Sequence, residues 1–275
     1  MTRAILLMLI GMSFIPAGDA ASKILTTELG VQPLFVSWSR FLVGAICILP
    51  FMLSGGWSIF RDPWVWVRGA LIGCGISFIT IALQTVDLAT AFGGLFFAPI
   101  VSFVTAAIFL KEPVTPTRTA LVVMGFGGVL LVAQPGLNFS AGTGFALLAG
   151  VCYGLFLTLS RVVAPKYKPF PLVFSQMAIA MVLLLPFGLG SVPDFNPAIT
   201  AQVLMSGLFS MTGNLLLIMA YSLAPATRLA PLVYFQLIAA LVLGWLVFST
   251  LPNGLALLGL FVIAGSGFAT FVLKR

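Results

Sequence analysis

Residues 33–37 read Pro-Leu-Phe-Val-Ser, and residues 171–175 read Pro-Leu-Val-Phe-Ser, so that Pro, Leu and Ser recur at an offset of 138 residues in a chain of 275. The same offset relates four more identical pairs: Gly75 with Gly213, Ala82 with Ala220, Phe97 with Phe235, and Ile100 with Ile238. Because the offset is half of the chain length, we predict an internal duplication. Repeat one covers about residues 1–136, and repeat two covers about residues 137–275.

The composition is that of a protein dissolved in lipid. Hydrophobic residues make up 61% of the chain and charged residues only 7%, whereas soluble domains carry about 25% charged residues. So few charges cannot cover the surface of a soluble protein. Lipid offers no hydrogen-bond partners to the backbone, whereas in a helix the backbone N–H and C=O groups bond to one another. We therefore predict an all-α integral membrane protein whose surrounding partner is the lipid bilayer.

Apolar runs of about 20 residues, the length that crosses a bilayer, recur between Gly, Pro and charged residues. We predict ten transmembrane helices in a single domain, residues 1–275, with spans at 4–22, 33–53, 67–85, 89–110, 117–134, 142–160, 170–189, 199–221, 227–248 and 254–273. Five spans per repeat is an odd number, so the second repeat enters the membrane inverted. Inverted repeats are typical of secondary transporters, which bind substrate near the midplane between the halves.

The basic residues predict the orientation of these spans. With the N-terminus placed in the cytoplasm, eleven basic residues fall on the inner side: Arg3, Arg61, Arg68, Lys111, Arg118, Arg161, Lys166, Lys168, Arg228, Lys274 and Arg275. Lys23 lies in an outer loop, and Arg40 lies within a span. This positive-inside bias places both termini in the cytoplasm. The net charge of +7 is thus a signal of topology, and we expect no nucleic-acid partner.

Most catalytic chemistry lacks its residues in this chain. There is no His, which excludes Ser-His dyads and His-based zinc sites, and there is no GxxxxGK[ST] loop for a nucleotide. Cys47, Cys74 and Cys152 sit singly in apolar runs, without metal-ligand spacing. We expect a protein that is not an enzyme and that has no metal and no cofactor.

Two stripes of polar residues mark the third and eighth predicted spans. Ser77, Thr80 and Gln84 share one helical face, and Ser206, Ser210 and Asn214 share another. The two spans are equivalent in the two repeats. The stripes predict either the walls of a wet central cavity or hydrogen bonds between helices, which are worth about 0.6 kcal/mol each in membranes.

Aromatic and amide side chains near the same depth extend the candidate site. Together with the stripes they give these candidate substrate-binding residues: Trp38, Ser77, Phe78, Thr80, Gln84, Tyr153, Ser210, Asn214, Tyr234 and Gln236. Such a lining is aromatic and weakly polar, which suits neutral or aromatic solutes.

Asp19 and Arg40 are charged residues within predicted spans, at similar depths in the outer half of the membrane. One hypothesis is an ion pair near the outer mouth that acts in gating or coupling, or that anchors a substrate carboxylate. The alternative is that Arg40 extends outward to the headgroups while Asp19 pairs with Lys23 one turn away. The sequence leaves both open.

Three motifs resemble the EamA-type proteins of the drug/metabolite transporter superfamily. They are the sequence from Phe109 through Lys111-Glu112-Pro113 to Thr115, the glycine-rich run Gly125-Phe-Gly-Gly-Val129, and the opening of the second span from Pro33 to Arg40-Phe41. The equivalent place in the second repeat, Ser249-Thr-Leu-Pro252, lacks the acidic residue. Glu112 is interpreted as structural.

The resemblance covers the whole chain and is strongest to the aromatic amino acid exporters of the YddG type. It implies a basket-like bundle in a bacterial inner membrane, which exports amino acids with broad specificity. We expect a monomer that works by alternating access, as inverted repeats do. Export of another small metabolite or drug remains open, as does a dimer. A non-transporting receptor or assembly subunit is the alternative of a different class.

Overall fold

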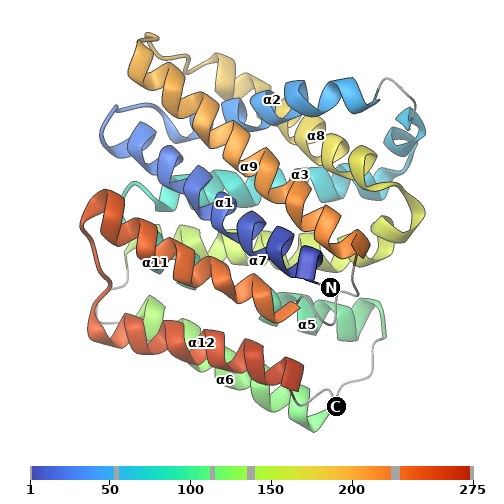
Figure 1. Ribbon diagram of the computed structural model, residues 1–275, viewed down its shortest axis with the longest axis vertical. Helices are drawn as coiled ribbons and strands as arrows, with labels where there is room; N and C mark the ends of the chain where they lie inside the picture. Colours follow the sequence, from blue (N-terminus) through green and yellow to red (C-terminus); the bar gives the residue numbers. More distant parts are fainter. Residues whose placement is uncertain (1, 53–55, 112–114, 135–139, 224–229, 273–275) are drawn as a thin grey trace.

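The protein is a bundle of helices that run roughly parallel or antiparallel to one another (Figure 1). The computed structural model describes residues 2–52, 56–111, 115–134, 140–223 and 230–272. Within these ranges all regular secondary structure is helical. The elements are α1 (Thr2–Thr27), α2 (Pro33–Met52), η1 (Trp57–Arg61), α3 (Pro63–Ala82), α4 (Leu88–Leu95), α5 (Ala98–Phe109), α6 (Pro116–Ala133), α7 (Ala141–Val163), η2 (Ala164–Lys166), α8 (Pro169–Leu189), α9 (Pro197–Leu223), η3 (Ala230–Tyr234), α11 (Phe235–Phe248) and α12 (Gly254–Val272).

Several helices are long and apolar enough to cross a bilayer. Six segments meet both conditions, namely α1, α2, α3, the pair α4–α5, α7 and α8, and shorter apolar helices lie in α6, η3–α11 and α12. Large apolar side chains point outward, such as Phe109, which is 75% exposed, and Phe261, which is 72% exposed. Such a surface is stable in lipid, and the protein is a multi-pass membrane protein.

Proline breaks two of the predicted spans. The predicted span 89–110 consists of α4 and α5, which are separated at Phe96 and Phe97, just before Pro99. Proline lacks a backbone N–H, so one hydrogen bond of the helix is not formed, and the helix is weakened at that point. In the ninth predicted span, the 3-10 turn η3 contains Pro231 and leads into α11. The α4–α5 break includes Phe97, and α11 begins at Phe235 directly after η3; the 138-residue offset relates these two residues.

Other predictions of span ends need smaller changes. The first predicted span, 4–22, is too short, because α1 continues through Pro16 and through Lys23 to Thr27. Residues 227–229, Glu112, Arg228, Lys274 and Arg275 lie outside the described residues.

The break between α4 and α5 lies against two glycines of α7. A Cβ atom on Gly150 would lie 2.7 Å from the carbonyl oxygen of Gly94, and one on Gly154 would lie 2.6 Å from that of Ala98. Both distances are too short for a real side chain. The glycines therefore make room for the carbonyl groups of the interrupted span.

The helices pair across the two halves of the chain in a reciprocal pattern. Helix α1 packs against α9, while α3 packs against α7; α2 packs against α8, and α6 packs against α12. Likewise α4 and α5 contact α7, while α11 contacts α1. The first turn of α1 and the last turn of α12 lie at the same end of the bundle (Figure 1).

Candidate substrate-binding site

A polar cluster centred on Arg68 joins three helices from both halves of the chain. Arg68 lies in the second turn of α3. Its Nε donates to Ser160 Oγ of α7 (2.8 Å), its Nη1 to the carbonyl oxygen of Leu172 in α8 (3.2 Å), and its Nη2 to Gln176 Oε1 of α8 (2.8 Å). The arginine is 5% exposed and the glutamine 2%.

Two lines of contact lead from Arg68 to residues that the sequence singles out. In the first, Gln176 Nε2 donates to Asn214 Oδ1 of α9 (3.5 Å), and Asn214 Nδ2 donates to the carbonyl oxygen of Ser210 (2.8 Å). In the second, the Arg68 Cζ lies 4.5 Å from the centre of the Phe156 ring, and Tyr153 stacks on Phe156 at 5.7 Å. A guanidinium over an aromatic face is a favourable cation–π contact.

The Arg68 cluster is defined here as Arg68, Tyr153, Phe156, Ser160, Gln176 and Asn214. It brings together Tyr153 and Asn214 of the predicted site, with Ser210 beside them. Arg68 and Gln176 are not among the candidate site residues predicted from the sequence, where Arg68 counts only as one of the inner basic residues. The available signal was a polar amide within an apolar span, which hydrocarbon penalises unless the amide has partners.

The hydroxyl groups in the polar stripe of α3 form hydrogen bonds with the backbone of their own helix. The hydroxyl groups of Ser77 and Thr80 are buried and donate to the carbonyl oxygens of Gly73 (2.9 Å) and Ile76 (2.7 Å). Gln84 lies beyond the end of α3 at Ala82, in an exposed position of the following turn. Its place in a helical stripe is therefore lost, because the helix ends before it.

The stripe of α9 contacts α1. Ser206 Oγ and Ser22 Oγ of α1 share a hydrogen bond of 2.7 Å, and both side chains are buried. Close to them, a Cβ on Gly18 would lie 3.1 Å from the carbonyl oxygen of Ser206. For Ser206, the structure agrees with the reading of the stripe as hydrogen bonds between helices.

Other candidate residues lie in separate helix interfaces. Trp38 of α2 is buried and occupies the space beside Gly188 of α8. Phe78 of α3 stacks on Phe145 of α7 with ring centres 6.0 Å apart. The structure does not bring these aromatic rings into the Arg68 cluster.

Two candidates of the second half lie near α11. The ring of Tyr234 is 5.2 Å from that of Phe96, between α4 and η3. Gln236 is buried and its Nε2 donates to the Met12 sulfur (2.8 Å). Both residues line the contacts of α11 and η3 with the first half.

Asp19 and Arg40 form a buried ion pair between α1 and α2, through Arg40 Nη1 and Asp19 Oδ1. Lys23 takes no part in this pair. Its Nζ instead donates to the carbonyl oxygens of Leu83 (2.8 Å) and Val86 (2.6 Å), just past the end of α3. The structure thus has the pairing of the first hypothesis.

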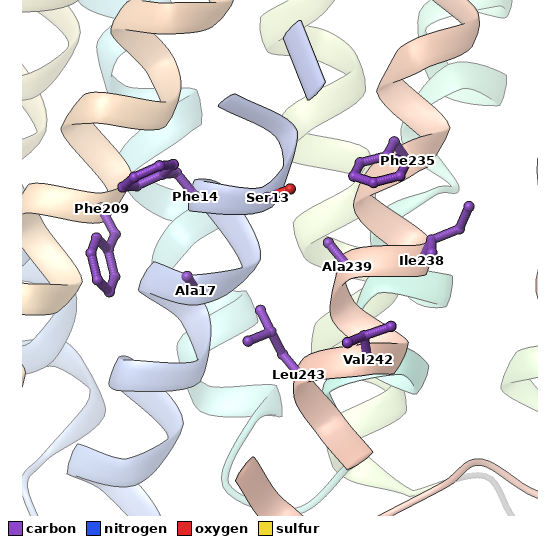
Figure 2. A pocket seen from close by; sticks show the side chains of 9 residues that line it. All are labelled: Ser13, Phe14, Ala17, Phe209, Phe235, Ile238, Ala239, Val242 and Leu243. Atoms are coloured by element: carbon purple, nitrogen blue, oxygen red, sulfur yellow. The ribbon is translucent and has the colours of Figure 1, made fainter. Parts of the chain in front are cut away.

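An apolar groove separates α11 from α1 and α9. Its volume is about 400 Å³, and it is lined by Ser13, Phe14, Ala17, Phe209, Phe235, Ile238, Ala239, Val242 and Leu243. Figure 2 shows side chains of α1 and α9 on one side and of α11 on the other. The hydroxyl of Ser13 donates to the Leu9 carbonyl oxygen of its own helix (3.0 Å). The groove is distinct from the Arg68 cluster and has apolar walls.

Comparison with known proteins decides the family. The sequence profile of the EamA-like transporter family matches residues 2–134 and, separately, residues 140–272. The chain belongs to the EamA-like transporter family. Each match covers one half of this EamA-like protein.

Curated relatives of this EamA-like chain are named as transporters. An S-adenosylmethionine uptake transporter of Rickettsia felis is 27% identical over 254 residues, which cover 90% of this chain and 85% of the relative. A riboflavin transporter of Rhizobium johnstonii is 26% identical over 265 residues, which cover 94% of this chain and 86% of the relative. These names give no support to the expected resemblance to aromatic amino acid exporters.

A solved crystal structure has the same fold as this EamA-like protein. It aligns with a TM-score of 0.68 at 19% identity and covers all of this chain and 98% of its own. At this identity the likeness shows the fold alone.

Proposed function

We propose that this EamA-like protein carries small amino-acid-like metabolites across the bacterial inner membrane by alternating access between two inverted five-helix repeats. Ten crossings, with both termini in the cytoplasm, follow from counting α4–α5 and η3–α11 as one crossing each. Two separate family matches and the reciprocal helix pairing support this arrangement. As a monomer the chain supplies both halves.

The Arg68 cluster is the observation that carries the proposal. It joins α3 of the first half to α7, α8 and α9 of the second, at the interface where inverted-repeat transporters bind substrate. A buried polar cluster inside a membrane bundle is costly, and such groups typically mark a substrate route.

The substrate class combines the sequence with the relatives. S-adenosylmethionine carries the amino acid group of methionine, so a relative named for its uptake favours amino-acid-like solutes. The second candidate substrate is a flavin, which the name of the other relative favours. These names do not support export: one relative is named for uptake, and the other is named without a direction.

Uptake into liposomes tests the proposal. Purified protein is reconstituted and supplied with labelled amino acids, S-adenosylmethionine or riboflavin, with empty liposomes as the blank. We expect time-dependent accumulation of amino-acid-like solutes, which Asn214→Ala reduces while Gln32→Ala, a change of an exposed amide, leaves it unchanged. Accumulation of riboflavin alone would identify a flavin, and not an amino-acid-like solute, as the substrate. Accumulation of no solute would favour a receptor or assembly subunit.

A further inference from the structure

Arg68 holds a positive charge inside the bundle with neutral partners. Its three acceptors are a hydroxyl, a backbone carbonyl and an amide oxygen. An arginine stays protonated in proteins. The charge of Arg68 is therefore buried inside the helix bundle, and its hydrogen-bond partners do not neutralise it.

The described acidic side chains are engaged or exposed elsewhere. Asp19 pairs with Arg40. Asp62 caps α3 through the Trp64 N–H and lies 3.7 Å from Lys166, whereas Asp87 caps α4. Two more, Glu28 and Asp194, are exposed. Among the residues that the structure describes, Arg68 thus has no carboxylate partner.

Arg40 provides an internal comparison. It is a second arginine buried in the same bundle, 1% exposed, and the chain supplies Asp19 as its counter-charge. Buried charges in membrane proteins are normally paired. Among the described residues, Arg40 thus has a carboxylate partner, whereas Arg68 has only neutral ones.

The guanidinium retains capacity for a ligand. Of its five N–H groups, the three described bonds use one on Nε, one on Nη1 and one on Nη2. This leaves one N–H on each terminal nitrogen without a described protein acceptor. A carboxylate accepts two such bonds from an arginine. Tyr153 and Asn214, both candidate substrate residues, lie one contact further away, beyond Phe156 and Gln176.

We infer that Arg68 recognises the carboxylate of the transported solute. This inference rests on the proposed transport function and narrows it: the substrate class is small metabolites with a free carboxylate. In the state described here, Ser160 and Gln176 hold the guanidinium in place. A flavin without a carboxylate has no group to neutralise Arg68.

Matched probes that differ at one group test the inference. The melting temperature of the purified protein is measured against L-methionine and L-methioninamide, and against L-phenylalanine and L-phenylalaninamide. We expect the acids to stabilise the wild type at lower concentrations than the amides. Arg68→Gln should raise the concentration of acid needed by about tenfold or more, the usual loss for a hydrogen bond to a charged group, and should remove the preference for acids.

Three further variants make the test specific. Arg61→Gln removes an exposed arginine seven residues away and should keep the preference for acids. Arg68→Lys keeps the positive charge but lacks the planar guanidinium, so it should keep part of the preference for acids over amides. If Arg68→Gln does not fold, Gln176→Glu supplies an internal carboxylate: it should raise the melting temperature without ligand by about 3 °C or more and abolish the preference.

The outcomes separate the subsite from the proposed function. Equal stabilisation by acids and amides, or a preference for acids that survives Arg68→Gln, overturns the assignment of Arg68 while transport stands. A lower melting temperature of Gln176→Glu also counts against a carboxylate at this place. A wild type that neither binds nor transports any of the amino-acid probes overturns the proposed substrate class itself.

Discussion

Arg40 of α2 forms an ion pair with Asp19 of α1, and the side chains are 1% and 3% exposed. Each of these helices has its main contacts elsewhere, α1 with α9 and α2 with α8. The pair therefore ties together two helices of the first half that otherwise pack largely against the second half. Neutralisation within the pair also lets two charged residues lie inside spans.

Removal of one partner of this pair should be more damaging than removal of both. Asp19→Asn leaves the Arg40 charge buried without its partner and should lower the free energy of unfolding by about 3 kcal/mol or more. The double variant Asp19→Leu with Arg40→Met should recover most of this loss, because apolar residues replace both charges. Thermal unfolding of the purified variants measures both effects.

The same double variant tests whether the pair acts in gating or coupling. If it does, the double variant should be stable but slow in liposome uptake. Uptake at the wild-type rate by a stable double variant would reduce the pair to a structural role.

Lys23 should stabilise the turn between α3 and α4. Its ammonium donates to the carbonyl oxygens of Leu83 and Val86, which lie past the end of α3. Lys23→Met removes both charge-assisted bonds and should cost about 1.5–3 kcal/mol of stability. The exposed Lys168 is the matched control, and Lys168→Met should leave the melting temperature unchanged.

The contact of α6 with α12 depends on two facing glycines. A Cβ on Gly128 would lie 2.8 Å from the Gly259 carbonyl oxygen, and one on Gly259 would lie 2.6 Å from that of Gly128. Gly128→Ala or Gly259→Ala should separate the helices and lower the melting temperature. Nothing lies within 4 Å of a Cβ on the adjacent Gly127, so Gly127→Ala should fold as well as the wild type. Equal effects at positions 127 and 128 would contradict this account.

Cysteine labelling in cells tests the inverted topology. In a background without Cys47, Cys74 and Cys152, single cysteines replace four exposed residues: Glu28, Arg61, Lys166 and Asp194. A membrane-impermeant thiol reagent should label positions 28 and 194 from outside and positions 61 and 166 only after lysis. Labelling of positions 28 and 166 from the same side would be incompatible with five crossings per repeat.

The membrane fold was accessible from the sequence because apolar length and charge carry its main signals. The spans agree with the helices within a few residues in most places, for example 33–53 against α2 and 170–189 against α8. The predicted first span ends at residue 22, before the charged Lys23, whereas α1 continues to Thr27. The charge lies within the helix because two backbone carbonyls satisfy it.

The candidate site was accessible only in part. Periodicity identified Asn214 and Ser210, and depth identified Tyr153, but neither signal says which helices meet. Arg68 was assigned to the inner surface because basic residues near span ends usually lie there. Its burial depends on Ser160 and Gln176, which are 92 and 108 residues away in sequence, and a single sequence does not contain that pairing.

The α4–α5 break and the glycines of α7 fit against each other and depend on each other, although about 50 residues separate them in the chain. The carbonyl oxygens of Gly94 and Ala98 occupy the places where side chains at positions 150 and 154 would be. A larger residue at either position requires the interrupted span to be rebuilt at the same time. As this sequence evolves, these two regions can therefore change only together. The break between α4 and α5 persists only while α7 keeps small residues at positions 150 and 154.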